Sequence, residues 1–213
     1  MRILWITVVA IVIDQITKLA VMRKMHLGQS IPILGDWLKL TYTENPGMAF
    51  GIIFGPEGMV TVFSIIATCL IILYMYSVRS GYKPYRASLA LILGGAFGNI
   101  IDRMFYGVLF GDAALFAGKV VDFIHVNVWR GYVPESIPFI GGKYLALFPI
   151  WNVADMAIVL GVTGILLFQK RFHNLQVTAT EVTPMPEASE NGFLKDVDAT
   201  VEYLPDAPSD ERV

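Results

Sequence analysis

Two carboxylates stand out for the chemistry that they could do. Asp155 lies in the apolar run Pro149–Phe168, which contains no other ionisable residue, and Asp122 lies upstream, in the stretch Lys119–Ile124. A carboxylate in such a run is costly unless it is paired, hydrated or neutralised. If two carboxylates meet near a membrane surface, like charge and poor hydration raise one pKa, and the pair shares a proton. One carboxyl then stays protonated while the other accepts a proton from water, which is what hydrolysis of a peptide bond needs.

Further polar side chains in the apolar segments are spaced so that they share helix faces. These faces should point into the protein, because lipid offers a polar group no partner. The three sets are Asn152 with Asp155 at i and i+3, Asn99 with Asp102 and Arg103 at i, i+3 and i+4, and Asp14 with Lys18 at i and i+4.

The residues alone leave several roles open. Asp14–Lys18 and Asp102–Arg103 could be structural pairs that neutralise themselves, and Arg103 could instead anchor a lipid phosphate or a peptide carbonyl. Spacing does not show that Asp122 and Asp155 meet. Hydrolysis, proton or ion translocation and purely structural polar contacts therefore remain as three classes of function.

The composition is that of a membrane protein. The chain has 213 residues, of which 55% are hydrophobic and 16% charged, whereas a soluble domain carries roughly 25% charged residues. Four segments have the length that a hydrocarbon core about 30 Å thick requires. These predicted spans are Ile3–Met22, Met59–Val78, Ala87–Tyr106 and Pro149–Phe168.

Basic residues predict the orientation of these spans. Arg2, the short connection Arg79–Arg86 and the pair Lys170–Arg171 fall on one side of a four-span protein, and short basic loops stay in the cytoplasm. Both termini are therefore expected inside. A signal peptide is the rival interpretation of the first span, but Asp14 and Lys18 interrupt its apolar run and no clear cleavage site follows.

The connections between the spans suggest a small sheet at the membrane surface. Ile31–Thr43 is typical of short strands, and Asn45-Pro-Gly is typical of a turn. The loop Gly107–Phe148 is long and rich in glycine and aromatic residues. Within it Val120–Val128 alternates, which fits a strand or a short helix. We expect the two long stretches beside Asp122 to cover the site.

The last forty residues differ from the rest. From Asn174 to Val213 the chain holds nine of its eighteen acidic residues and only two basic ones, Lys195 and Arg212. This composition predicts a disordered acidic tail at 174–213, on the cytoplasmic side, after a membrane body at 1–173. The single Cys69 and three scattered histidines have no metal-ligand spacing, so no metal or cofactor is expected.

Five motifs in this order closely resemble those of the lipoprotein signal peptidases, also called signal peptidase II. The resemblance covers residues 3–170. The motifs are Asp14-Gln-Ile-Thr-Lys18, Asn45-Pro-Gly-Met-Ala-Phe-Gly51, Gly94-Gly-Ala-Phe-Gly-Asn-Ile-Ile-Asp-Arg103, Val120-Val-Asp-Phe123 and Asn152-Val-Ala-Asp155.

The resemblance implies an aspartic endopeptidase of the bacterial cytoplasmic (inner) membrane. Its substrate would be a prolipoprotein with diacylglycerol on a cysteine, cut just before that cysteine by a water that an aspartate pair activates. By motif, Asp122 and Asp155 match the catalytic pair. Substrate-binding or supporting roles fall to Asn45, Asn99, Arg103, Asn152, Asp14 and Lys18.

The implied fold is an all-α membrane protein, a bundle of four transmembrane helices with a small β-platform and a long loop on the outer side. The active site would lie near the outer leaflet, without a metal or cofactor. Membrane lipid and prolipoproteins are the expected partners, nucleic acid is not, and a monomer is expected. The alternative is a small proton-coupled transporter with Asp14, Asp102 and Asp155 as a relay.

Overall fold

The computed structural model of the chain describes residues 3–49, 52–53, 58–79, 81–111, 113–128, 130–138, 141–142, 144–146 and 148–181. The chain divides into two compact units, Met1–Leu175 and Gln176–Val213. The fold reported below is that of the first unit.

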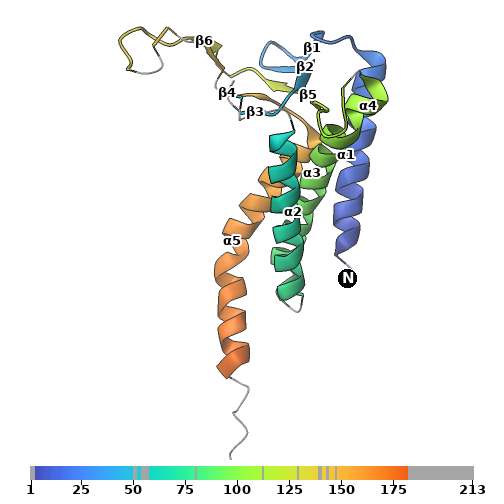
Figure 1. The fold of residues 1–213 in the computed structure, drawn as a ribbon. Helices are drawn as coiled ribbons and strands as arrows, with labels where there is room; N and C mark the ends of the chain where they lie inside the picture. Colours follow the sequence, from blue (N-terminus) through green and yellow to red (C-terminus); the bar gives the residue numbers. More distant parts are fainter. Residues whose placement is uncertain are drawn as a thin grey trace, which may run out of the picture. The chain divides into compact units, whose positions relative to one another are not determined.

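Four helical segments are long and apolar enough to cross a membrane. Side chains of Leu, Ile, Val and Phe cover their exposed faces, which suits contact with lipid. Figure 1 shows the helices side by side, with strands at one end and the α2–α3 connection at the other. The predicted four-helix membrane bundle is confirmed. Its elements are α1 (Leu4–Lys24), α2 (Met59–Ser77), α3 (Lys83–Ile101) continued by η1 (Asp102–Tyr106) and α4 (Gly107–Phe110), and α5 (Val153–Glu181).

Two helices begin at residues that differ from the predicted ends of the spans, Ala87 and Pro149. α3 starts earlier, at Lys83, with Pro84 in its first turn, where the missing N–H of proline costs no hydrogen bond. α5 starts at Val153 and not at Pro149, because Ile150–Trp151 form a strand, β8, that pairs with β5. An apolar run can thus contain a strand and a helix that hydrophobicity alone does not separate.

The predicted small sheet is present at the end of the bundle. Its order is β1-β2-β5-β8, and each neighbouring pair is antiparallel. The strand interpretation of Val120–Val128 is correct, since Val120–Val126 forms β5 in the middle of this sheet. The other strands are β1 (Ser30–Leu34) and β2 (Leu38–Asn45), with two small hairpins, β3 (Met48–Ala49) with β4 (Ile52–Ile53) and β6 (Arg130–Tyr132) with β7 (Tyr144–Ala146).

Glycines bring three helices together at the sheet end. A Cβ on Gly98 would lie 2.6 Å from Asp14 Oδ2, and a Cβ on Gly95 would overlap the carbonyl oxygen of Ala154. Only glycine allows α1 and α5 to approach α3 this closely. The glycine-rich run of α3 is therefore a place of close helix packing.

The π-helical turn η1 lets the next segment fold back onto the bundle. The N–H of Gly118 donates to the carbonyl oxygen of Arg103 at 2.9 Å, and that of Ala113 donates to Gly107 at 3.3 Å. π-Turns inside α-helices expose carbonyls in this way and often occur at functional sites. The segment ends directly before β5, so it helps to set the position of Asp122.

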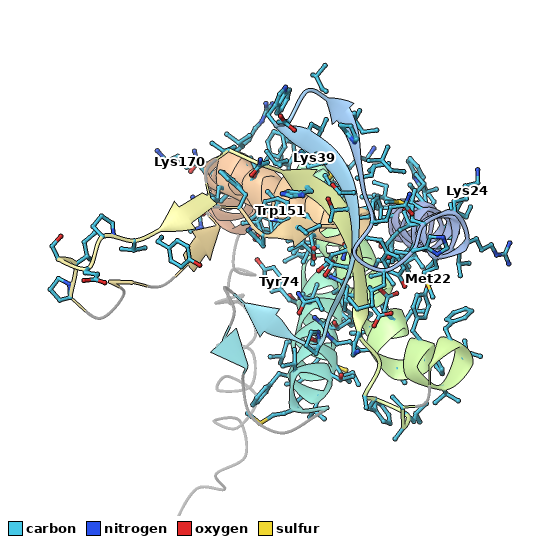
Figure 2. The ribbon with its side chains drawn as sticks, turned by 90° about the horizontal axis from the view of Figure 1, so that it is seen from above. Met22, Lys24, Lys39, Tyr74, Trp151 and Lys170 are labelled. Atoms are coloured by element: carbon cyan, nitrogen blue, oxygen red, sulfur yellow. The ribbon has the colours of Figure 1, made fainter. Side chains whose placement is uncertain are left out.

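Two predictions stay predictions. The hairpin β6–β7 projects away from the four-stranded sheet in Figures 1 and 2, and a covering role for the loop around it is untested. The acidic tail predicted from residue 174 is described only as far as Glu181, within α5, and residues 182–213 lie outside the described part of the chain.

Candidate active site

Asn152 and Asp155 form a reciprocal cap at the start of α5. The N–H of Asp155 donates to Asn152 Oδ1 at 2.9 Å, and the N–H of Asn152 donates to Asp155 Oδ2 at 3.3 Å. Asparagine is among the best N-cap residues, and a carboxylate three positions later completes a capping box. The cap fixes the orientation of both side chains at the point where the strand β8 becomes a helix.

Asp122 reaches the same cap from β5. Asn152 Nδ2 donates to Asp122 Oδ1 at 2.6 Å, and both residues are buried. One asparagine therefore contacts both carboxyls: its side-chain nitrogen donates to Asp122, and its backbone N–H donates to Asp155. Asp122 and Asp155, called the dyad below, are brought to one place although they are 33 positions apart in the sequence.

Asn99 of α3 contacts the dyad from a third element. Its Nδ2 donates to Asp155 Oδ1 at 2.8 Å, and its Oδ1 accepts from Asn152 Nδ2 at 3.1 Å. Both oxygens of Asp155 thus accept hydrogen bonds, from the Asn99 amide and from the Asn152 backbone N–H.

The surroundings of Asp122 favour its protonated form. Burial and, second, the nearby charge of Asp155 raise the pKa of Asp122 to about 7, against the opposing effect of hydrogen bonds from Asn152 and Asn45. A carboxyl with this pKa can keep a proton at neutral pH and give it up during a reaction.

A second group of charges lies beside the dyad, between α1 and η1. Lys18 Nζ is 2.8 Å from Asp14 Oδ2 and 2.8 Å from Asp102 Oδ2, and all three side chains are 0% exposed. Asp14 Oδ1 also accepts the N–H of Ala154 at 2.8 Å, and Asp102 Oδ2 that of Val121 at 3.2 Å. We call Lys18, Asp14 and Asp102 the lysine cluster.

This cluster corrects one expectation. The sequence suggests that Asp102 pairs with its neighbour Arg103, but in the described part of the chain its ion pair is with Lys18. Adjacent residues on a helix point about 100° apart, so closeness in sequence does not bring these two side chains together. The Asp14–Lys18 pair is present as predicted.

Arg103 and Asn45 complete the predicted set. The guanidinium of Arg103 is largely buried and lies in the field of Asp155, Asp102 and Asp122, and its Nε has no hydrogen-bond partner among the described residues. Asn45, at the end of β2, hydrogen bonds Asp122 and accepts the N–H of Gly47 at 2.9 Å. All eight residues predicted as site residues therefore surround one centre.

Sequence reasoning missed two members of this network. Gln15 Nε2 donates to Asp102 Oδ1 at 2.9 Å and to Asp14 Oδ2 at 3.1 Å, and Tyr106 donates its hydroxyl to Gln15 Oε1 at 3.0 Å. The signal available was position: Gln15 lies inside the first motif, and Tyr106 follows Asp102 by four residues, on the same helix face.

An apolar cavity of about 190 Å³ lies beside the dyad. In β5, Ile124 and Val126 lie on the same strand face as Asp122, and in α5 Met156 directly follows Asp155. Figure 2 shows Trp151, of the edge strand β8, beside the start of α5 and away from Met22 and Lys24 of α1. The cavity is lined by Ile124, Val126, Phe148, Pro149, Trp151 and Met156.

The arrangement can perform acid/base chemistry at an apolar surface. Among the described residues, no group of three or more His, Cys, Asp and Glu side chains could hold a metal ion. The two carboxyls that the structure brings together are those of Asp122 and Asp155.

Comparison with known proteins gives a consistent result. A family model described as signal peptidase (SPase) II matches residues 6–171. A protein named lipoprotein signal peptidase from Amoebophilus asiaticus (strain 5a2) is 40% identical over 195 residues, which are 84% of this chain and 83% of the relative. One of the same name from Chlorobium phaeobacteroides (strain BS1) is 36% identical over 163 residues, 76% of this chain and 91% of the relative.

Solved structures agree in fold. A structure described as a bacterial membrane enzyme superposes with a TM-score of 0.56 at 25% identity, over 86% of this chain and 93% of the other. A second with that description gives a TM-score of 0.55 at 29% identity, over 78% and 90%.

Proposed function

The chain belongs to the signal peptidase II family, aspartic peptidases that process bacterial lipoproteins, and we propose that Asp122 and Asp155 are the catalytic pair with which it does so. One observation carries the proposal. Asn152 contacts both carboxyls, at 2.6 Å to Asp122 Oδ1 and through its reciprocal cap to Asp155. Carboxyls joined by a neutral residue in this way are suited to share a proton.

The proton of the pair belongs on Asp122. The pKa of Asp122 is raised to about 7 by burial and by the charge of Asp155. Asp155 accepts a hydrogen bond at each oxygen, from Asn99 Nδ2 and from the backbone N–H of Asn152. Donors on both oxygens stabilise a carboxylate, so Asp155 is the base and Asp122 the acid.

The reaction follows from these two states. Asp155 takes a proton from a water whose oxygen attacks the carbonyl carbon before the lipidated cysteine, while Asp122 gives its proton to the carbonyl oxygen. The tetrahedral intermediate then collapses. Its hydroxyl proton returns to Asp122, Asp155 passes its proton to the leaving amine, and the C–N bond breaks.

The remaining residues have proposed roles in holding the substrate. Arg103 has an unpartnered Nε and lies beside the dyad, so it would donate a hydrogen bond to a peptide carbonyl or a lipid phosphate of the substrate. Asn45 orients Asp122 from β2. The apolar cavity beside β5 and α5 offers a surface for the apolar parts of the substrate.

The protein is a bacterial integral membrane protein with four spanning helices. We propose that it resides as a monomer in the cytoplasmic (inner) membrane. The sheet would lie on the outer side, both termini in the cytoplasm and the dyad near the outer leaflet. The concentration of basic residues in the short connections at the opposite end supports this orientation.

The test is cleavage by the purified protein in detergent. Two precursors of one sequence are compared, one with a diacylglyceryl-modified cysteine and one unmodified, and mass spectrometry identifies the bond that is cut. We expect a cut just before the cysteine in the lipidated precursor alone. Equal cutting of both precursors, or cutting elsewhere, would contradict the proposed substrate, and proton uptake by proteoliposomes without cleavage would favour the transporter alternative.

A further inference from the structure

Lys18 contacts neither carboxyl of the dyad, yet its contacts reach both through amide groups. Its third donor bond goes to Asn99 Oδ1 at 3.0 Å, beside its ion pairs with Asp14 and Asp102. Asn99 Nδ2 then donates to Asp155 Oδ1 at 2.8 Å. The path from ammonium to dyad is thus a single side-chain amide.

This path has a direction. An ammonium group has only donors, so the Asn99 atom that faces it must be the oxygen. Asn152 Nδ2 faces the same oxygen at 3.1 Å, also as a donor. The other end of the Asn99 amide, which faces Asp155, is therefore its NH2 group. An amide has nearly the same shape when flipped, and its neighbours alone decide which atom points where.

We propose that Lys18 is a positioning residue that locks the Asn99 amide with its NH2 group on Asp155 and so keeps Asp155 the ionised member of the dyad. The inference rests on the proposed dyad and deepens it. A flipped Asn99 would present an oxygen to Asp155 and favour a protonated Asp155, which could not take a proton from water.

The design of the cluster supports this role. Lys18 is fully buried and each of its three donors has one acceptor, so its ammonium cannot turn away from Asn99. The N–H of Ala154 binds Asp14, and that of Val121 binds Asp102. These two residues precede the dyad residues in sequence, so the cluster holds the backbones on which the dyad stands.

Other charged residues near the dyad also act on the protonation of its carboxyls. Among the described residues they are Asp14 and Lys18 of α1 and Asp102 and Arg103 of η1, while Asn45 of β2 contributes a neutral hydrogen bond. Lys18 acts directly on Asp122 as well, because its charge lowers the pKa of that carboxyl. A test must therefore separate this field from the amide lock.

A double-mutant cycle makes that separation. Lys18→Met combined with Asp14→Asn removes the cation together with one of its anions, so that the buried charges stay nearly balanced. Asn99→Ala removes the amide. Both variants, and their combination, are assayed with the lipidated precursor. If Lys18 acts through Asn99, each variant lowers kcat about tenfold with KM within about twofold, and the combination loses no more than Asn99→Ala alone.

The pH profile supplies a readout that a structural role would not move. Without Lys18 the acidic limb of kcat should shift upward, by roughly half a pH unit or more, because a flipped Asn99 favours the protonated form of Asp155, the proposed base. In the Asn99→Ala background, where the amide is already absent, the same change should not move the limb further. Thr7→Val is the matched control, since Thr7 is buried in α1 and donates to the Ala90 carbonyl of α3 at 2.9 Å, away from the dyad. It should not shift the limb.

Three results would overturn the inference. The first is additive losses of kcat in the cycle, and the second is an acidic limb that does not move. The third is a Thr7→Val variant that loses as much activity as the Lys18 variant at an equal loss of stability. Activity in Asp122→Asn or Asp155→Asn would instead contradict the proposed dyad itself, so the two failures are distinguishable.

Discussion

Two pairs of aspartates lie in the same interior and are held in opposite ways. Asp14 and Asp102 share a cation, Lys18, at 2.8 Å each. Asp122 and Asp155 share a neutral residue, Asn152, which donates its side-chain NH2 to Asp122 and its backbone N–H to Asp155. A cation between two carboxylates allows both to stay ionised. A neutral amide does not, so repulsion between the carboxylates favours a proton on one of them. The first pair is therefore suited to structure and the second to proton transfer.

Removing the titratable oxygen from the dyad should have the largest effect. Asp122→Asn and Asp155→Asn should each lower kcat by about 10²–10⁴-fold, because an amide keeps the shape but cannot exchange a proton. Both variants should stay folded. The measurement is cleavage of lipidated precursor, with Asp36→Asn, an exposed aspartate of the Lys39 ion pair, as the control. Full turnover in either variant would exclude that residue from the mechanism.

Removing the cation of the first pair should lower stability as well as activity. Lys18→Met leaves Asp14 and Asp102 buried without a counter-ion, and breaking such a pair costs about 3–5 kcal/mol. Thermal unfolding in detergent measures the loss. Lys39→Met is the control, since exposed ion pairs contribute only about 0–1 kcal/mol. Equal losses of stability in Lys18→Met and Lys39→Met would show that the lysine cluster does not stabilise the fold more than a surface ion pair does.

Proton binding should distinguish the two pairs as pH changes. The pKa of Asp122 is raised from its usual 3.8 to about 7. The stability that its protonation contributes is therefore present below about pH 4 and lost as pH rises through about 7. Unfolding free energies between pH 4 and 8 should fall in the wild type and fall less in Asp122→Asn.

Activity should follow the same proton, because the proposed acid is Asp122 in its protonated form. The alkaline limb of kcat/KM is expected near pH 7. Identical pH dependence of stability in the wild type and in Asp122→Asn would show that Asp122 is not the group that titrates.

Arg103 should give the smallest effect, since it lies beside the dyad without belonging to either pair. Arg103→Ala should raise KM for the lipidated precursor about tenfold, because hydrogen bonds to a charged group are worth about 1.5–3 kcal/mol. Arg103→Lys keeps the charge but loses the planar fork and should recover only part of the affinity. An unchanged KM in Arg103→Ala would exclude the anchor role.

Much of this site could be predicted because its residues break a rule. A carboxylate in a spanning run, as at Asp155, is conspicuous, and Asn152 three positions before it has the spacing of a cap. Gln15 escaped notice because it directly follows Asp14, and adjacent residues on a helix do not share a face as residues at i and i+3 do. The predicted partner of Asp102 was wrong, because Arg103 is its neighbour in sequence, whereas the packing of α1 against α3 and η1 places Lys18 against it.

Boundaries were harder to predict for a related reason. Ile150–Trp151 are as apolar as the helix that follows, and only their pairing with Ile124 and His125 of β5 makes them a strand. The strand β5 itself was one of two interpretations, since a short alternating run also fits a helix. Long-range pairing decides such cases, and a single sequence does not display it.

The junction at Asn152 has a consequence for the membrane around the protein. This single residue separates β8 from α5, so the sheet and the helix meet without a flexible linker. Helices tilt when bilayer thickness changes, and a tilt of α5 would carry β8, and with it β5, along. Asp122 and Asp155 would then move together, and the distance between them would be insulated from the thickness of the lipid in which the protein resides.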